Sequence, residues 1–297
     1  MPIKILPAIA LLGTISGLAG AEELGPLPQL EAYQVPESWL QPVPPLKIAD
    51  NSWQIGTEAI TSLLLKDPAG AVLIDGGMAQ TADHLLGNLK ALGLQPSDLK
   101  LILHSHAHAD HVGSLAALQR ATGARVVTNA ESAMLLASGG ADDIHFGDNL
   151  LYPPVQADRI LHHGELVTLG KLRLQVHFIP GHTPGSMAWT WQDKVDGKTM
   201  NIAYVDSLSA PDYQLVDNPR YPDIVQDYRL SFERVGQLPC DLLITPHAGA
   251  SGWHYKARAE QEKPIGCRAY AERAHKKLER QISAQKVMQS ARGQAGP

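Results

Sequence analysis

The feature that most constrains this chain is a short run of metal-type ligands, His106 to His111, with the pattern His-x-His-x-Asp-His. Histidine is the commonest metal ligand, and its neutral imidazole suits zinc. Burying four such groups at one point is costly unless a cation holds them together. The apolar run 99–103 predicts a buried strand before the motif, and 112–122 predicts a helix after it. The motif is therefore expected at the carboxyl end of a strand, where open α/β sheets place their binding sites.

Two later histidines follow predicted strands in the same way. His182 lies in Pro-Gly-His-Thr-Pro-Gly, whose glycines and prolines predict a tight loop after the strand expected over 171–179. His247 follows the buried strand expected over 241–245. Five histidines and one aspartate, shared between two ions, leave room for a common water, and that open position marks a catalytic site. A single buried histidine is more often a core residue, but the shared placement of all five favours a metal site.

The remaining pattern predicts a mixed α/β chain in two halves. Strands are expected over 52–55, 59–66, 71–74, 99–103 and 124–128, and then over 159–161, 166–168, 171–179, 187–192, 200–205 and 241–245. Helices are expected over 79–92, 112–122, 131–137 and 224–235, and over 257–287 with a break at Pro264. Two sheets packed face to face, with helices outside, would bury these strands on both faces. After residue 21 the sequence shows no segment with the composition of an interdomain linker, so one domain is expected over 22–297.

The first residues have the pattern of a secretory signal peptide. Lys4 supplies a positive charge, an apolar stretch follows over 5–18, and Ala19-Gly20-Ala21 is a small-residue cleavage site. Cleavage after Ala21 predicts a periplasmic protein; an uncleaved membrane anchor is the alternative. Residues 24–47 are rich in proline and predict an extended arm.

The net charge limits the classes of binding partner that we expect, and the two cysteines bear on the cellular compartment. Removal of residues 1–21 leaves 24 basic against 30 acidic side chains, a net charge of −6. Such a chain does not favour nucleic acid or an anionic membrane as partner. In an oxidising compartment a disulfide between Cys240 and Cys267 is the favoured interpretation, with two unlinked thiols as the alternative. The bridge would join the C-terminal helix to the strand at 241–244.

Together these motifs resemble the metallo-β-lactamase superfamily. A narrower resemblance, to subclass B3 metallo-β-lactamases, covers nearly the whole chain after residue 21 and is carried by segments 206–211, 213–215, 218–222 and 246–251. It implies a four-layer αββα sandwich and two zinc ions. The implied ligands are His106, His108 and His182 for one ion, and Asp110, His111 and His247 for the other. The implied activity is hydrolysis of the β-lactam amide bond of penicillins, cephalosporins and carbapenems by a metal-bridging hydroxide, giving antibiotic resistance.

The resemblance also implies roles around the metals. Asp110 would orient the hydroxide as well as bind metal. Tyr213 would donate a hydrogen bond near the developing oxyanion, with a loop aromatic packed on the fold as the alternative. Ser207 and Ser209 would bind the substrate carboxylate, directly or through water, with loop capping as the alternative role for both. Trp39 and Phe146 are candidates for apolar walls over the site, with core packing as the alternative.

Two further residues are expected to lie beside the metal ligands without binding metal. Asp75 directly follows a buried strand and is a candidate to accept the second N–H of a ligand histidine, with turn capping as the alternative. His104 departs from the apolar residue expected in this subclass, and we expect it to pack beside the site rather than to bind metal.

Three alternatives stay open at this point. Another hydrolase of the superfamily, a thioesterase or a lactonase, would use an additional aspartate to bridge the metals, and Asp206 lies in the right neighbourhood. A non-enzymatic zinc-binding module is the second alternative, although structural zinc is typically closed by four protein ligands. The third question is assembly, since the arm at 24–47 could join subunits of a homo-oligomer such as a tetramer.

Overall fold

The computed structural model describes residues 34–256 and 265–294. All of these residues belong to one compact unit, Tyr33–Pro297. The predicted signal peptide, the first part of the proline-rich arm and the predicted helix break at Pro264 lie outside the described residues. None of the described helices combines the length and the hydrophobicity needed to cross a membrane.

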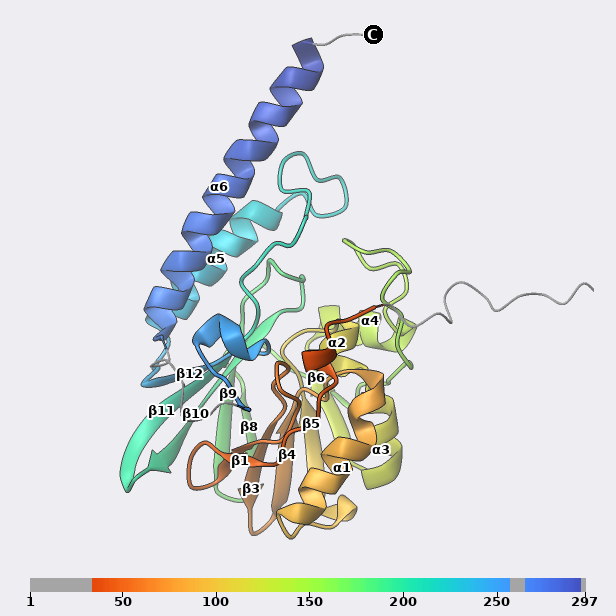
Figure 1. The fold of residues 1–297 in the computed structure, drawn as a ribbon, viewed down its shortest axis with the longest axis vertical. Helices are drawn as coiled ribbons and strands as arrows, with labels where there is room; N and C mark the ends of the chain where they lie inside the picture. The colour runs from red at the N-terminus through yellow and green to blue at the C-terminus, as the bar shows by residue number, and fades with distance from the viewer. Residues whose placement is uncertain (1–33, 257–264, 295–297) are drawn as a thin grey trace, which may run out of the picture. The chain divides into compact units, whose positions relative to one another are not determined.

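Two β-sheets form the centre of this unit (Figure 1). The first has the strand order β1 (Leu46–Lys47), β2 (Ser52–Gln54), β3 (Leu63–Asp67), β4 (Gly70–Ile74), β5 (Leu99–Leu103), β6 (Arg125–Thr128) and β7 (Arg159–Ile160). The second has the order β12 (Leu242–Ile244), β11 (Lys198–Val205), β10 (Met187–Val195), β9 (Leu172–Phe178) and β8 (Leu166–Leu169). Strands β4 to β7 pair in parallel, as do β11 and β12, and the other neighbours are antiparallel.

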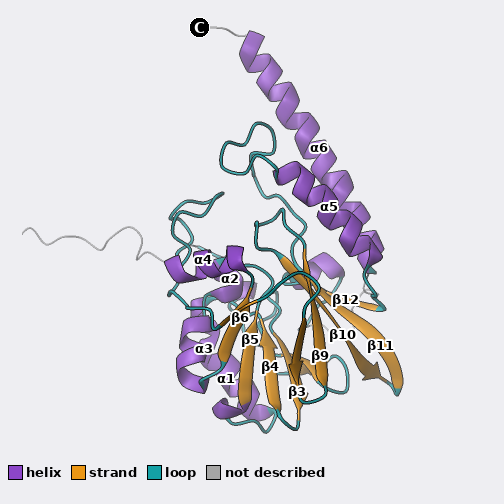
Figure 2. Ribbon diagram, turned by 180° about the vertical axis from the view of Figure 1, so that it is seen from behind, coloured by secondary structure: helices purple, strands orange, loops and turns teal. Residues whose placement is uncertain are grey.

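Helices cover the outer face of each sheet. They are α1 (Ala82–Ala91), α2 (Ala109–Val112), α3 (Leu115–Thr122), α4 (Ala130–Ser138), α5 (Ile224–Gln237) and α6 (Cys267–Gln294). Short 3₁₀ turns lie at Glu37–Trp39, Ala79–Thr81, Pro96–Asp98 and Ala248–Ser251. Figure 2 shows α1 and α3 beside the first sheet, and α5 and α6 beside the second.

The alternation of side chains along each strand explains this layering. Leu63 and Leu65 of β3 pack between the two sheets, in one core with Trp189 and Tyr204 of the second sheet. Leu64, between them in sequence, belongs to the core under α1 and α3. A third core joins the second sheet to α5 and α6. Because successive side chains of a strand point to opposite faces, apolar strands such as β3 are buried on both sides. The predicted αββα sandwich is confirmed.

One predicted helix is wrong in its course. The helix expected over 112–122 is two helices, α2 and α3, and the first begins already at Ala109. The break has a long-range cause, because the amide of Ser114 donates to the carbonyl of Gly77 at 3.4 Å. Val112 also pairs with Gly77 as an isolated bridge. The segment after β4 thus fixes α2, which carries two of the motif residues.

The predicted disulfide is present. Cys240, just before β12, is joined to Cys267, the first residue of α6, with the two Cα atoms 6.1 Å apart. The bridge therefore joins the C-terminal helix to the second sheet as expected.

Candidate metal centre

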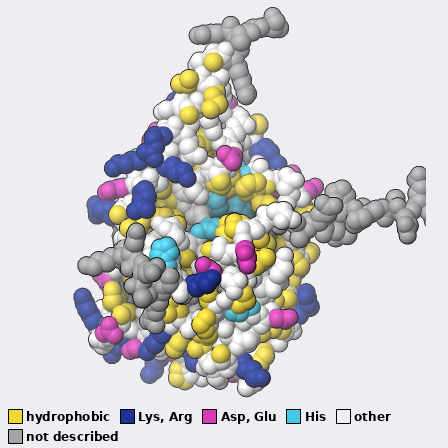
Figure 3. All heavy atoms as spheres, in the orientation of Figure 1, with side chains coloured by type: hydrophobic (Ala, Val, Ile, Leu, Met, Phe, Trp, Pro, Cys, Tyr) yellow, Lys and Arg dark blue, Asp and Glu magenta, His cyan; other side chains and the backbone are white. Residues whose placement is uncertain are grey.

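The six predicted ligands come from strand ends that meet at one edge of the sandwich. His106 and His108 follow β5, and Asp110 and His111 lie on α2. His182 lies between β9 and β10, in a loop where Gly181 has φ +142° and a Cβ there would lie 2.7 Å from the ring of Tyr228. His247 follows β12. Figure 3 shows histidine side chains gathered on this face with hydrophobic side chains around them.

The loop that carries His247 is held by the segment between β2 and β3 of the first sheet. The amide of Ala248 donates to the carbonyl of Ala59 at 3.0 Å, and Ile60 pairs with His247 as an isolated bridge. The hydroxyl of Thr61 donates to the carbonyl of Thr245 at 2.7 Å. These contacts bring a ligand from the second half of the chain beside those from the first half.

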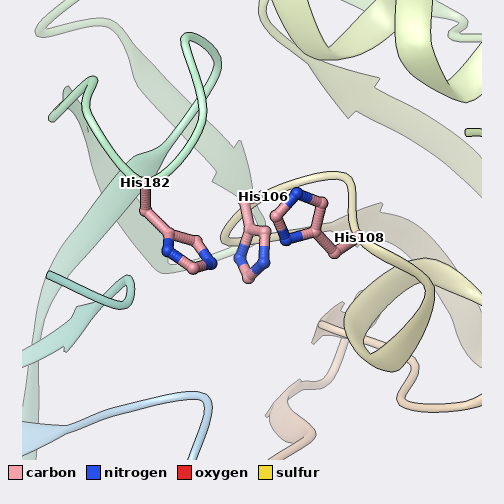
Figure 4. Close-up of side chains that lie close together, drawn as sticks. All are labelled: His106, His108 and His182. Atoms are coloured by element: carbon pink, nitrogen blue, oxygen red, sulfur yellow. The ribbon is translucent and has the colours of Figure 1, made fainter. Parts of the chain in front are cut away.

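The ligand atoms are close enough to share metal ions. One atom each of His106, His108 and His182 lie within 4.8 Å of one another, and so do those of His106, Asp110 and His111. Figure 4 shows the imidazoles of the first group side by side. Asp110 Oδ2 lies 3.0 Å from His111 Nε2 and 3.3 Å from His247 Nε2. All six predicted ligands are therefore adjacent, and five are buried while His247 is partly exposed.

Three of the ligand histidines have a partner on one ring nitrogen, which leaves the other for a metal. His106 Nδ1 lies 2.7 Å from Asp206 Oδ1, and His182 Nδ1 lies 2.8 Å from the carbonyl oxygen of Ser209. His108 Nε2 lies 3.4 Å from Asp143 Oδ2 but does not form a hydrogen bond with it. Such partners fix the tautomer and the orientation of a metal-binding imidazole.

Asp75 has the position that the sequence predicts. Its carboxylate accepts hydrogen bonds from the amide and hydroxyl of Ser105, at 2.6 and 2.8 Å, and from the hydroxyl of Tyr204 at 2.7 Å. Its Oδ2 also lies 3.5 Å from His111 Nδ1. Asp75 thus contacts Ser105, the residue before His106, and also the predicted ligand His111. Burial raises its pKa to about 6.

The charges in the cluster suit a bound cation. Burial, together with the neighbouring histidines, holds the pKa of His106 and of His182 well below the ordinary value. Burial opposes charge on His111 as well, but Asp110 and Asp75 raise the pKa of His111 to about 9. The same partnership outweighs burial at Asp110 and lowers its pKa. His106 and His182 are therefore neutral with available lone pairs, and the proton held at His111 is what a metal would replace.

The unpaired atoms give a test of whether the residues fit a metal. His106 Nε2, His108 Nε2, both ring nitrogens of His111 and Asp206 Oδ2 are buried, and none of them forms a hydrogen bond of normal geometry among the described residues. Unpaired buried polar atoms of this kind are rare, and a role in binding an ion is one explanation for them. Imidazole nitrogens with a carboxylate oxygen are typical zinc ligands. The residues therefore fit a metal centre.

The residues predicted to contact substrate surround the ligands. The hydroxyl of Tyr213 lies 3.5 Å from His182 Nδ1, and burial raises the pKa of this phenol, which stays a neutral donor. Phe146 contacts the ring of His108 with centroids 5.3 Å apart, and Trp39 contacts His247 with centroids 5.0 Å apart. Both aromatic rings thus lie against predicted ligand histidines.

The two predicted serines lie beside the ligand partners. Ser207 is buried, and its amide donates to Asp206 Oδ1 at 2.6 Å. Ser209 is half-buried, and its carbonyl oxygen accepts from His182 and from the hydroxyl of Tyr228. No side-chain hydrogen bond of either serine occurs among the described residues, so both hydroxyls are available to a ligand.

His104 packs beside the centre, as expected. It is buried, and its Nε2 lies 2.5 Å from the hydroxyl of Thr128. Burial lowers its pKa to about 4.

Sequence reasoning missed Asp143 and left the role of Asp206 open. Asp206 follows a buried strand, as Asp75 does, and that position was a usable signal. Asp143 lies in the loop between α4 and β7, where no local pattern distinguishes it from Asp142.

Comparisons with known proteins agree with this geometry. Residues 55–196 match a family model described as the metallo-beta-lactamase superfamily. MIM-1, a metallo-β-lactamase from Novosphingobium pentaromativorans, is 39% identical, with a TM-score of 0.78, covering 85% of this chain and 94% of that one. BJP-1, a subclass B3 metallo-β-lactamase of Bradyrhizobium japonicum, is 30% identical, with a TM-score of 0.77, covering 85% and 98% respectively.

The curated relatives carry other names. A hydroxyacylglutathione hydrolase of Anaeromyxobacter dehalogenans is 37% identical over 132 residues, which are 44% of this chain and 42% of that protein. The match thus spans less than half the length of this relative.

Proposed function

Because the chain belongs to the metallo-β-lactamase superfamily and is a hydrolase of that superfamily, we propose that it is a two-zinc β-lactamase. Its proposed substrates are penicillins, cephalosporins and carbapenems, and its proposed role is antibiotic resistance. The observation that supports this most strongly is the coverage of the comparisons. The two metallo-β-lactamase structures named above match over 94% and 98% of their length, whereas two curated hydroxyacylglutathione hydrolases match over 42% and 70% of theirs.

The proposed ligands divide into two sets of three. His106, His108 and His182 would hold one zinc, and Asp110, His111 and His247 the other. When bound, a zinc pair supplies Lewis acidity that activates water and polarises the lactam carbonyl. Asp110, which already contacts His111 and His247, would orient the attacking water.

The surrounding side chains would bind and orient the lactam. Tyr213, kept neutral by burial, would donate to the carbonyl oxygen as it gains charge. The hydroxyls of Ser207 and Ser209 would bind the carboxylate that penicillins and cephalosporins carry. Trp39 and Phe146 would cover the ring system and exclude water from the site.

A thioesterase is the second candidate function, favoured by the names of the curated relatives. In that alternative Asp206 would bridge the metals. The contact of Asp206 Oδ1 with His106 Nδ1 instead supports a role in orienting the His106 imidazole from the side away from the metal.

Metal titration with three substrates separates the candidates. The purified protein is treated with a chelator, reloaded with zinc in steps and assayed with a chromogenic cephalosporin, an acyl thioester of glutathione and a lactone. Zinc-dependent turnover of the cephalosporin alone supports the lactamase, and turnover of only the thioester or lactone overturns it. Zinc binding without any turnover would leave a non-enzymatic zinc-binding module.

Export is a separate part of the proposal. The N-terminal pattern described above would deliver the enzyme to the periplasm, where β-lactams meet their targets. Mass measurement of the protein recovered from the periplasmic fraction should give a chain that starts at Glu22. A chain recovered from the cytoplasm with Lys4 still present would contradict it.

A further inference from the structure

Asp143 joins a ligand histidine to a loop of the substrate site. It is only 3% exposed, and its two carboxylate oxygens have different partners. Oδ2 lies 3.4 Å from His108 Nε2, a contact that does not have the geometry of a hydrogen bond in this structure. Oδ1 accepts hydrogen bonds from the amides of His145 and Phe146, at 2.8 and 2.9 Å. One buried carboxylate thus touches both the metal centre and the start of the loop.

The loop that Asp143 caps is closed on itself and carries two aromatic side chains, His145 and Phe146. The amide of Gly147 donates to the carbonyl of Asp143 at 2.9 Å, and the amide of Asp143 donates to the carbonyl of Gly147 at 3.1 Å. Inside this closed segment, the ring of His145 stacks on Tyr213 with centroids 3.5 Å apart and planes 6° apart. Phe146 lies against both Tyr213 and His108. Residues 143–147, called here the wall loop, therefore position an aromatic wall over the ligands.

The chemistry of His108 makes this contact sensitive to metal. With Nε2 facing Asp143, the nitrogen left for a metal is Nδ1. An imidazole that binds metal through one nitrogen carries its proton on the other, and that N–H donates to the carboxylate. Without metal, a neutral imidazole can hold its proton on either nitrogen. Metal binding thus strengthens the His108–Asp143 contact, and an ordered Asp143 favours metal binding in return.

We propose that Asp143 is a positioning residue that couples metal binding at His108 to the closed form of the wall loop. The aromatic wall of the substrate site then becomes ordered when the metal arrives. This inference rests on the proposed metal centre but not on β-lactams as substrates.

Asp143→Asn is the informative variant, and Asp142→Asn is its matched control. An asparagine at 143 keeps the volume and one oxygen for the two amides, but its amide group would present a donor to the N–H of His108. Asp142 is the preceding residue, its side chain is 90% exposed, and its charged partner is Arg220. Zinc affinity is measured by competition with a chromophoric chelator. Hydrogen exchange at the amides of His145 and Phe146 is measured with and without zinc.

We expect zinc to slow exchange of both amides in the unmodified protein. Asp143→Asn should weaken the affinity for one zinc by about 10- to 100-fold and abolish the slowing, while Asp142→Asn should match the unmodified protein within about twofold. If the unmodified protein binds zinc but exchange is unchanged, the coupling is disproved, and this measurement needs no variant. If Asp143→Asn bound zinc as tightly as the unmodified protein, the coupling would also be disproved. Failure of the unmodified protein to bind zinc would instead refute the proposed function.

Discussion

The Oδ1 atom of Asp206 lies 2.7 Å from Nδ1 of His106, and both side chains are fully buried. The two residues come from different sheets, because His106 follows β5 and Asp206 follows β11. A carboxylate in this position holds the imidazole from behind and leaves Nε2 free. A ligand from the first half of the chain is therefore oriented by a residue from the second.

Asp206→Asn tests this arrangement. Loss of the charge behind His106 should weaken zinc affinity by about 10- to 100-fold while two zinc ions still bind at saturation. Competition with a chelator gives the affinity, and metal analysis gives the stoichiometry. A variant that binds a single zinc at saturation would show that Asp206 is itself a bridging ligand.

His182→Ala should reduce turnover far more than stability. The substitution removes one of three ligands from a zinc site but leaves both sheets intact, so we expect a loss of at least about 100-fold in kcat. The unfolding free energy of the metal-free protein should change by about 1 kcal/mol or less. His177→Ala is the control, because His177 lies on β9 and bonds Thr190 outside the site. Equal losses of turnover and folding in His182→Ala would contradict the assignment.

The metal-free protein should lose stability as the pH falls below about 6.5. Burial lowers the pKa of His104 to about 4 and depresses that of His106 and His182. These groups bind protons in the unfolded chain before they do so in the folded one, so their contribution to stability is lost as the pH falls. Asp75 and His111, whose pKa values are raised, act in the opposite direction but are outnumbered by the three histidines with lowered pKa values. Urea unfolding of the chelated protein at pH 5 and pH 7 measures the difference, and a higher midpoint at pH 5 would refute it.

The disulfide should contribute to stability but not to turnover. Cys240 and Cys267 are 27 residues apart in sequence, and replacing both with alanine should lower the unfolding free energy by about 3–4 kcal/mol. Turnover at 25 °C should stay within about twofold. A reducing agent should destabilise the unmodified protein by a similar amount and leave the double variant unchanged.

Ser209→Ala should weaken substrate binding, because the Ser209 hydroxyl is proposed to bind the carboxylate of the substrate. The carbonyl oxygen of Ser209, which accepts from His182, is unaffected by this change. Loss of one hydrogen bond to a charged group predicts a rise in KM of about 10-fold with a similar kcat. A cephalosporin whose carboxylate is esterified should show no difference between the variant and the unmodified protein. An equal rise in KM for the ester would exclude this role.

Local sequence patterns were sufficient where the cause of a structure is itself local. The apolar runs of β4 and β5 encode their own burial, and the run from His106 to His111 carries four candidate ligands within six residues. Asp75 could be predicted because it follows a strand directly. These signals predicted the two-layered sheet core and the group of six ligand candidates.

The features that sequence reasoning missed depend on residues far apart. The break between α2 and α3 arises from Ser114 bonding to Gly77, which lies before α1. Asp143 differs from its neighbour Asp142 only because the folded loop places it against His108. No periodicity or local motif encodes such a contact, so neither could be predicted from the segment in which it occurs.

The order of the metal-binding residues along the chain has a consequence for how the protein matures. Four of the predicted ligands come from the region of β5 and α2, but the other two, His182 and His247, and the supporting Asp206 are synthesised later. A growing chain therefore offers zinc only an incomplete and unsupported set of donors. We therefore expect zinc to bind tightly only after the second half has been synthesised and the two sheets have come together.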